Sequence, residues 1–116
     1  MVIAGSVDAL LSEDDTRMVF EAFERGCKRA YGIDIRSKKT IFNARTLKQV
    51  KSFAKEFGSE DGVRIIDKLF TEPYNGRFNG QTVGASIFSK GSWWIANKLL
   101  LVAGSPEEDD FVWKDF

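Results

Sequence analysis

The sequence predicts a mainly α fold, a single small domain of about four helices, and three observations support this. Apolar residues recur at spacings of three and four over most of the chain, which is typical of amphipathic helices. Glycines follow the expected helix ends, and serines or acids stand at several expected starts. The length of 116 residues and the hydrophobic content of 43% suit one buried core. We therefore expect one helical domain over residues 1–105 and a flexible acidic, aromatic tail over residues 106–116.

The first expected helix begins at Ser12 and ends before Gly32. Ser12 and the three acids after it have the form of an N-cap with a capping box, and the acids suit the positive end of the helix dipole. Residues 32–39 are polar and basic, and they are expected to form a loop or a short strand. The buried stripe of the helix is predicted from apolar residues about four apart: Val19, Phe23, Cys27 and then Ala30 or Tyr31.

The second expected helix runs from about Thr40 or Asn43 to Phe57 and is closed by Gly58. At about 100° per residue, its apolar residues fall in one arc and its basic residues in the opposite arc. Its polar face therefore carries one sign of charge, unlike the mixed charges of an ordinary solvated helix. The apolar arc holds Leu47, Val50, Phe53, Ala54 and Phe57, and the basic arc holds Arg45, Lys48, Lys51 and Lys55.

The third expected helix has Ser59 as its cap and acids in its first turn, and Pro73 stops it. Its predicted buried residues are Val63, Ile66, Leu69 and Phe70. The longest expected loop follows over residues 72–84, where glycines and asparagines are densest. This loop carries an aromatic-basic-aromatic set that suits stacking on bases, namely Tyr74, Arg77 and Phe78. The alternative is that the two aromatic side chains fold back over the core.

The last expected helix covers residues 85–102 and is either continuous or broken at Gly91, where Ser92 could cap a new start. Trp93, Trp94 and four consecutive aliphatic residues leave it little polar surface. It is therefore either central to the fold or part of a partner interface.

Charge is sorted along the chain although its net charge is zero. Between Arg25 and Lys55 there are ten basic residues and one acid, Asp34, whereas the first 24 residues and the tail are acidic. Such a segment predicts a polyanion-binding surface with acidic competitors in the same chain. The predicted nucleic-acid-binding residues are Arg36, Lys38, Lys39, Arg45, Lys48, Lys51 and Lys55, with Tyr74, Arg77 and Phe78 as stacking groups.

The sequence holds few residues for catalysis. Without a histidine and with Cys27 as its one cysteine, it cannot form a Ser-His-Asp triad, a Cys-His pair or a Cys/His zinc site. It also lacks the glycine motifs that bind nucleotide phosphates. We therefore expect no enzyme, no cofactor and no metal site. The single cysteine, and the lack of a basic leader or a long apolar run, predict a cytoplasmic protein without membrane contact.

The tail resembles the acidic C-terminal tails of bacterial and phage single-stranded-DNA-binding proteins, which end in aspartates and a phenylalanine. The resemblance is limited to the tail, because the body lacks the short alternating strands of their OB-fold. It implies that the tail recruits replication and repair enzymes or competes with DNA for the protein's own basic surface. A packed last strand is the alternative. The predicted partner-binding residues are Asp109, Asp110, Phe111, Trp113, Asp115 and Phe116.

The body is similar, more faintly, to helical modules of phage replication accessory proteins, in which a basic, a glycine-bounded and an aromatic-rich helix follow one another. The matching segments are residues 37–57, 58–70 and 88–101.

Two functions from different classes follow from these patterns. In the first, the protein is an accessory factor in phage-like DNA metabolism that binds DNA or RNA through the basic helix. In the second, it is a protein-binding adaptor or an inhibitor of a host enzyme and contacts no nucleic acid. The zero net charge favours the second. Self-association is a variant, in which the acidic tail or first helix of one copy docks on the basic segment of another.

Overall fold

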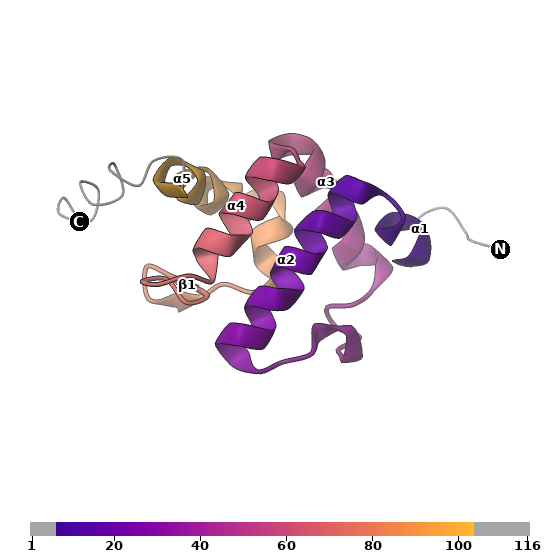
Figure 1. The fold of residues 1–116 in the computed structure, drawn as a ribbon, viewed down its shortest axis with the longest axis horizontal. Coiled ribbons are helices and arrows are strands. Elements are labelled where there is room, and N and C mark those ends of the chain that lie inside the picture. The colour runs from indigo at the N-terminus through magenta and orange to yellow at the C-terminus, as the bar shows by residue number, and fades with distance from the viewer. Residues whose placement is uncertain (1–6, 104–116) are drawn as a thin grey trace.

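The fold is mostly helical, as the sequence predicts. The computed structural model describes residues 7–103, and within that range it has five α-helices, with a β-hairpin between the fourth and the fifth (Figure 1). The predicted tail and its partner-binding residues lie outside the described residues. The helices are α1 (Val7–Leu11), α2 (Asp14–Tyr31), α3 (Ala44–Phe57), α4 (Ser59–Leu69) and α5 (Trp93–Ala103), and the hairpin pairs β1 (Arg77–Phe78) with β2 (Gln81–Thr82).

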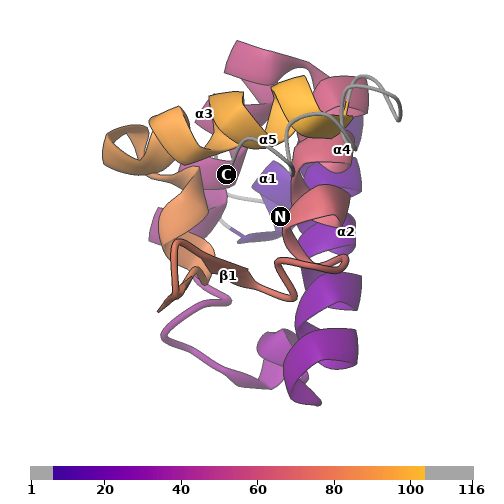
Figure 2. The same ribbon diagram turned by 90° about the vertical axis from the view of Figure 1, so that its left-hand side faces the viewer.

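Helix α2 is the central element of the bundle. It packs against both α3 and α4, while α5 packs on α4 and the short α1 packs on α3. Figure 2 shows α5 running across the upper part of α4, with the hairpin below it. Within the described range, no helix combines the length and the apolar character that crossing a bilayer requires.

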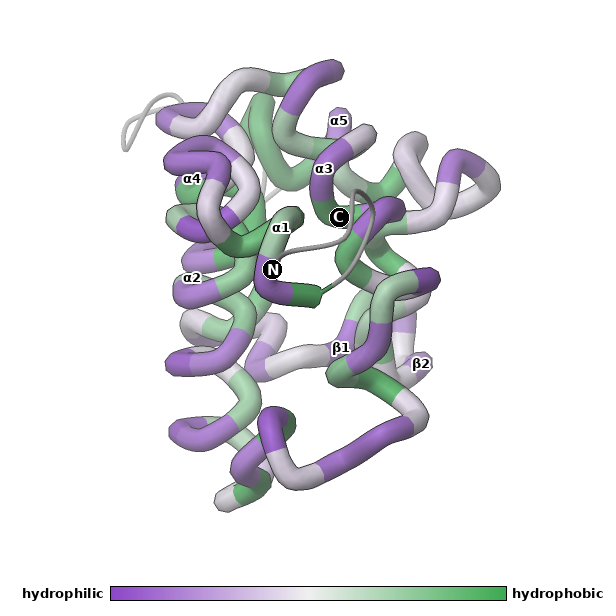
Figure 3. Tube along the Cα trace, turned by 90° about the vertical axis from the view of Figure 1, so that its right-hand side faces the viewer, coloured by the Kyte–Doolittle hydropathy of each residue, from purple (hydrophilic) through white to green (hydrophobic). Residues whose placement is uncertain are grey.

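Aromatic rings fill the centre of the core. The ring of Phe23 on α2 lies 5.8 Å from that of Phe70 and 5.0 Å from that of Phe88, measured between ring centroids. Phe88 in turn meets Phe53 of α3 edge-on at 5.2 Å. In Figure 3 the apolar stretches of the helices turn inward, and the hydrophilic stretches of α2 lie on the outside. The core therefore joins α2, α3 and the segment before α5 through ring contacts, which add to the free energy of simple burial.

Two glycines allow α2 and α4 to approach closely. A Cβ atom at Gly26 of α2 would lie 2.2 Å from Cδ2 of Phe70, at the end of α4. A Cβ atom at Gly62 of α4 would lie 2.8 Å from a methyl group of Val19. Both distances are shorter than a real Cβ contact, so these positions require glycine for steric reasons.

The predicted first helix differs from α2 at its start. A separate helix, α1, precedes it, and the Ser12 hydroxyl donates to the main-chain oxygen of Ala9, 2.6 Å away, in α1. The N-cap of α2 is Glu13, without a side-chain cap, so the capping role predicted for Ser12 is wrong. The rest of the prediction is confirmed: Val19, Phe23 and Cys27 are buried and Gly32 ends the helix with φ of 67°. The stripe continues through Tyr31, which is half-buried, and not through Ala30, which is exposed.

The predicted second helix is confirmed as α3. It begins after Asn43, whose side-chain oxygen accepts a hydrogen bond from the Thr46 amide at 2.9 Å, and it ends at Gly58. Gly58 is also the N-cap of α4, so the two helices share one connecting residue. Ser59 is therefore the first residue of α4, and its predicted role as the cap is wrong.

The segment before α5 is more structured than predicted. Residues 72–84 contain the hairpin, whose Asn79-Gly80 turn has positive φ at both residues, as a type I′ turn requires. The segment from Ala85 to Ser92 forms two short 3₁₀ turns instead of the start of an α-helix. Gly91 lies within the second of these turns, and α5 begins only at Trp93, so the helix predicted from residue 85 is shorter than expected. Residues 32–39 form a loop with one 3₁₀ turn, Ile35–Ser37.

Candidate nucleic-acid interface

Helix α3 presents its basic residues to solvent. Its apolar arc from Leu47 to Ala54 is buried, and Phe57 is half-buried. The opposite side carries the four predicted basic residues, all of them exposed: Arg45, Lys48, Lys51 and Lys55. This arrangement follows from the sequence, because burying one side of an amphipathic helix leaves the other in water. We call these four residues the basic face of α3.

The loop before α3 adds two cations at the N-terminal end of the helix. The side-chain amide of Asn43 donates to the main-chain oxygen of Lys39 at 2.6 Å, and the amides of Ile41 and Phe42 both donate to the main-chain oxygen of Lys38. These bonds hold the loop against the start of α3, while the side chains of Lys38 and Lys39 are exposed. The positive end of the helix dipole lies at the same place, so phosphate groups are favoured there.

Arg36 does not belong to this free surface. Its guanidinium contacts both carboxylate oxygens of Glu24 on α2, at 2.6 and 3.3 Å. It also lies 5.5 Å from the ring centroids of both Phe20 and Phe42. The hydrogen bond to Glu24 raises the pKa of Arg36, so it remains charged. Arg36 is therefore paired with an acid of the same chain, and this contact links the loop to α2.

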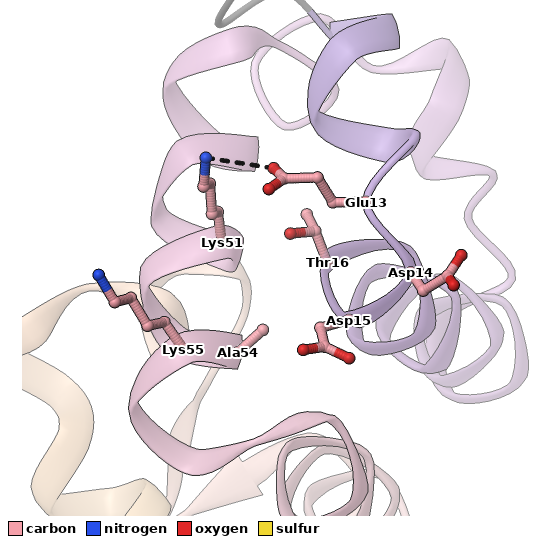
Figure 4. Close-up of a pocket in the computed structure, with 7 residues that line it drawn as sticks. All are labelled: Glu13, Asp14, Asp15, Thr16, Lys51, Ala54 and Lys55. Carbon is pink, nitrogen blue, oxygen red and sulfur yellow. Dashed lines mark ion pairs between the residues drawn. The ribbon is translucent and has the colours of Figure 1, made fainter.

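Lys51 is partly neutralised by the N-terminal end of α2. Its Nζ lies 3.2 Å from a carboxylate oxygen of Glu13, and both side chains are about half-exposed (50% and 46%). The pair borders an open pocket of about 320 Å³ between α2 and α3 (Figure 4). Figure 4 shows Asp15 beside this pocket, Asp14 directed away from it, and the ammonium of Lys55 extending away from the carboxylates. The pocket is lined by Glu13, Asp14, Asp15, Thr16, Lys51, Ala54 and Lys55.

The pocket carries charges of both signs, and this limits its affinity for anions. Carboxylates close to Lys51 lower the positive potential there, so the pocket does not favour an anion as strongly as the outer side of α3 does. An exposed ion pair contributes about 0–1 kcal/mol, however, so an incoming phosphate can displace Glu13 at little cost. The acidic start of α2 thus weakens anion binding at Lys51 without blocking it.

The remaining basic residues of the charged segment lie elsewhere. Arg29 of α2 donates to the main-chain oxygen of Phe70 at 3.1 Å. Burial raises the pKa of Asp67 on α4, and the nearby Arg25 and Arg29 act in the opposite direction. These arginines therefore face α4, and the segment does not form one continuous positive surface. Among the described residues, five of those predicted to contact phosphates have no ion pair: Lys38, Lys39, Arg45, Lys48 and Lys55.

The three predicted stacking residues are only partly brought together. The rings of Tyr74 and Phe78 are stacked, with centroids 5.7 Å apart and planes 20° from parallel. Both residues are half-buried, which agrees with the alternative that they cover the core. Arg77 pairs with Thr82 across the hairpin, and neighbouring strand residues point to opposite faces. Burial raises the pKa of Tyr31, and Arg77 lies near enough to oppose that effect.

Trp94 was not among the predicted site residues, although the structure brings it to this cluster. Its ring meets Phe78 edge-on, with centroids 5.8 Å apart, and it is 51% exposed. The neighbouring Trp93 instead donates from Nε1 to the main-chain oxygen of Phe88 at 3.1 Å. Consecutive residues of a helix lie about 100° apart, so only one of two adjacent tryptophans faces the core. The Trp-Trp pair was therefore the sequence signal for an exposed ring.

Neither a reactive cysteine nor a cluster of metal ligands is present among the described residues. Burial raises the pKa of the Cys27 thiol to about 11, so it is not a thiolate at neutral pH. Within residues 7–103, no group of three or more acidic, histidine or cysteine side chains is placed to hold a metal ion.

Comparisons with protein-family models, curated proteins and solved structures found no match to this chain.

Proposed function

We propose that the protein binds nucleic acid through the basic face of α3 and the adjoining lysines, as a non-enzymatic accessory factor in DNA metabolism. The observation that carries this proposal is the set of exposed cations on and beside α3 that have no ion pair among the described residues. A folded helix that keeps several like charges close together in water gains little stability from them. Such a face is therefore best explained by a polyanionic partner.

Binding of this kind is mainly electrostatic. If about five phosphates are neutralised, the logarithm of the affinity should fall with the logarithm of salt concentration with a slope of roughly −4 to −5 on duplex DNA. The contacts are to phosphates and not to base edges, so sequence preference should be weak. Lys51 adds a further contact once the phosphate displaces Glu13.

The tail is the second part of the proposal. Its acidic and aromatic residues, from Asp109 to Phe116, recruit a partner protein or compete with nucleic acid for the basic face. The resemblance of the tail to those of single-stranded-DNA-binding proteins supports this role.

The test is a salt titration of DNA binding by the full chain and by a chain that lacks residues 106–116. We expect both to bind labelled DNA at low salt, and the truncated chain to bind more tightly if the tail competes. Failure of both chains to bind at low salt would rule out the nucleic-acid proposal.

A protein-binding adaptor or inhibitor remains the second candidate, because α5 exposes apolar side chains. Trp94 is 51% exposed and Leu101, seven residues later on the same side of the helix, is 73% exposed. A partner groove could bury both residues. Capture of a stoichiometric partner that survives nuclease treatment would favour this candidate. Light scattering of the purified chain would show whether that partner is a second copy.

A further inference from the structure

We propose that the surface formed by Tyr74, Phe78 and Trp94, here called the aromatic face, stacks on unpaired bases. The ligand is then a single-stranded nucleic acid. This inference rests on the proposed function, because the cations of α3 supply phosphate contacts to the same strand.

The aromatic face combines two half-buried rings with one exposed ring. Tyr74 stacks on Phe78, and Phe78 meets Trp94, so the three rings form a continuous cluster. The hairpin and α5 hold the cluster from two sides, which limits the freedom of the rings before any ligand arrives. Trp94 nevertheless leaves half of its surface in water. A rigid, half-exposed indole ring is well suited to stack with a base, because little conformational freedom is lost on binding.

The charges around the aromatic face favour an anionic ligand. From Pro73 to Ala103 the chain has three basic residues and no acid. Lys98 follows Trp94 by four residues, which places it one turn further on the same side of α5. Lys90 lies 6.0 Å from the ring centroid of Trp93. Rings together with cations that form no ion pair among residues 7–103 match a strand that carries both bases and phosphates.

A ring contact links the start of α5 to the end of α3. Phe57, the last residue of α3, meets the ring of Trp93 edge-on, with centroids 5.8 Å apart. This contact sets the start of α5 beside the end of α3. Trp94, in the first turn of α5, therefore lies near this end of α3, although on a different side of α5 from Trp93.

A duplex cannot make the same contacts. Its bases are already stacked inside the helix, so it offers phosphates to α3 but no free base to Trp94. The inference therefore predicts a preference for single strands that depends on Trp94, whereas the basic face alone predicts none.

The experiment compares two labelled single strands of about 16 nucleotides with equal numbers of phosphates, one with bases and one abasic. Fluorescence anisotropy measures their affinity for the full chain and for three variants. Trp94→Leu removes the ring, Trp94→Phe keeps an aromatic face, and Leu101→Ala is the control at another exposed residue of α5. Circular dichroism checks that each variant is folded.

We expect the unmodified chain to prefer the strand with bases. Trp94→Leu should weaken binding to that strand by about 5- to 100-fold and leave the abasic strand unaffected. Trp94→Phe should retain most of the affinity, and Leu101→Ala should retain all of it. If Trp94→Leu does not fold, the preference of the unmodified chain for the strand with bases still decides whether bases contribute to binding.

Three outcomes would overturn the inference in different ways. Equal binding of both strands by the unmodified chain would remove base stacking and leave the proposed function in place. Failure to bind either strand at low salt would contradict both the base-stacking inference and the proposed function. Loss of a nuclease-resistant protein partner in Trp94→Leu, with unchanged binding of both strands, would assign the aromatic face to that protein instead.

Discussion

The basic residues of α2 and of α3 belong to one charged segment of the sequence, but the fold places them in different surroundings. Arg25 and Arg29 of α2 face Asp67 and the main chain at the end of α4. Arg45 and Lys48 of α3 are exposed and have no ion pair in the described part of the chain. The difference shows that a run of like charges along a sequence stays unpaired in the fold only where neighbouring elements offer those charges no partner.

The central position of α2 explains the difference. Because α2 packs between α3 and α4, its long side chains reach acceptors on neighbouring elements. We therefore expect changes on α2 to affect mainly the stability of the fold, and changes on α3 to affect mainly binding.

The close approach of α2 to α4 should be the most sensitive point. In Gly26→Ala the added Cβ would meet the ring of Phe70, which is packed against Phe23 and Tyr31. Overpacking should lower the free energy of unfolding by about 3 kcal/mol, whereas the higher helix propensity of alanine should raise it by up to about 1 kcal/mol. We expect denaturant titration to show a loss of about 2 kcal/mol in the free energy of unfolding. Gly91→Ala is the control, because nothing lies within 4 Å of its added Cβ. An equal loss in both variants would contradict the packing described for α2.

Arg36 should contribute to the stability of the fold and not to DNA binding. Arg36→Ala removes the contacts with Glu24, Phe20 and Phe42, and we expect the free energy of unfolding to fall by about 1–2 kcal/mol. Binding of DNA at low salt should change little. The matched change is Lys38→Ala, which should lower the affinity and leave the stability unchanged. A large loss of affinity in Arg36→Ala with normal stability would show that Arg36 contacts the ligand after all.

Glu13 should weaken DNA binding slightly, because it forms an ion pair with Lys51. In Glu13→Gln the lysine loses its ion pair, and we expect the affinity for DNA to rise about two- to fourfold at low salt. This gain should disappear at high salt, because exposed charges are screened there. Asp14→Asn removes the same charge from a side chain that pairs with Arg17 at 2.7 Å and not with Lys51, so it should have the smaller effect. Equal gains from both changes would indicate a general charge effect instead of competition at Lys51.

The parts of the fold that local signals determine were predictable from the sequence. Asn43 and Gly58 bound α3, Gly32 ends α2, and the apolar arc of α3 is buried. The cap of α2 was misplaced because the Ser12 hydroxyl bonds to a carbonyl of α1, a helix with little periodic signal. The hairpin was missed because strands of two residues are too short to show alternation, although its Asn79-Gly80 turn was visible.

The candidate site was predictable only in part, because its free charges depend on tertiary contacts. The exposure of Arg45 and Lys48 follows from helix periodicity. The contact of Arg36 with Glu24 joins residues twelve apart across a loop, and no local pattern reveals it. The sequence alone does not distinguish the surroundings of Trp93 and Trp94. The position of α5 in the fold determines that Trp94 is the exposed ring.

The most direct test compares one charge reversal on each of the two helices. Lys48→Glu changes the basic face of α3, and Lys28→Glu changes an exposed lysine of α2. The affinity of each folded variant for labelled DNA is measured at low salt. The account predicts that Lys48→Glu weakens binding roughly tenfold or more and that Lys28→Glu has little effect. Equal losses in the two variants, or no loss in either, would contradict the claim that α3 forms the nucleic-acid interface.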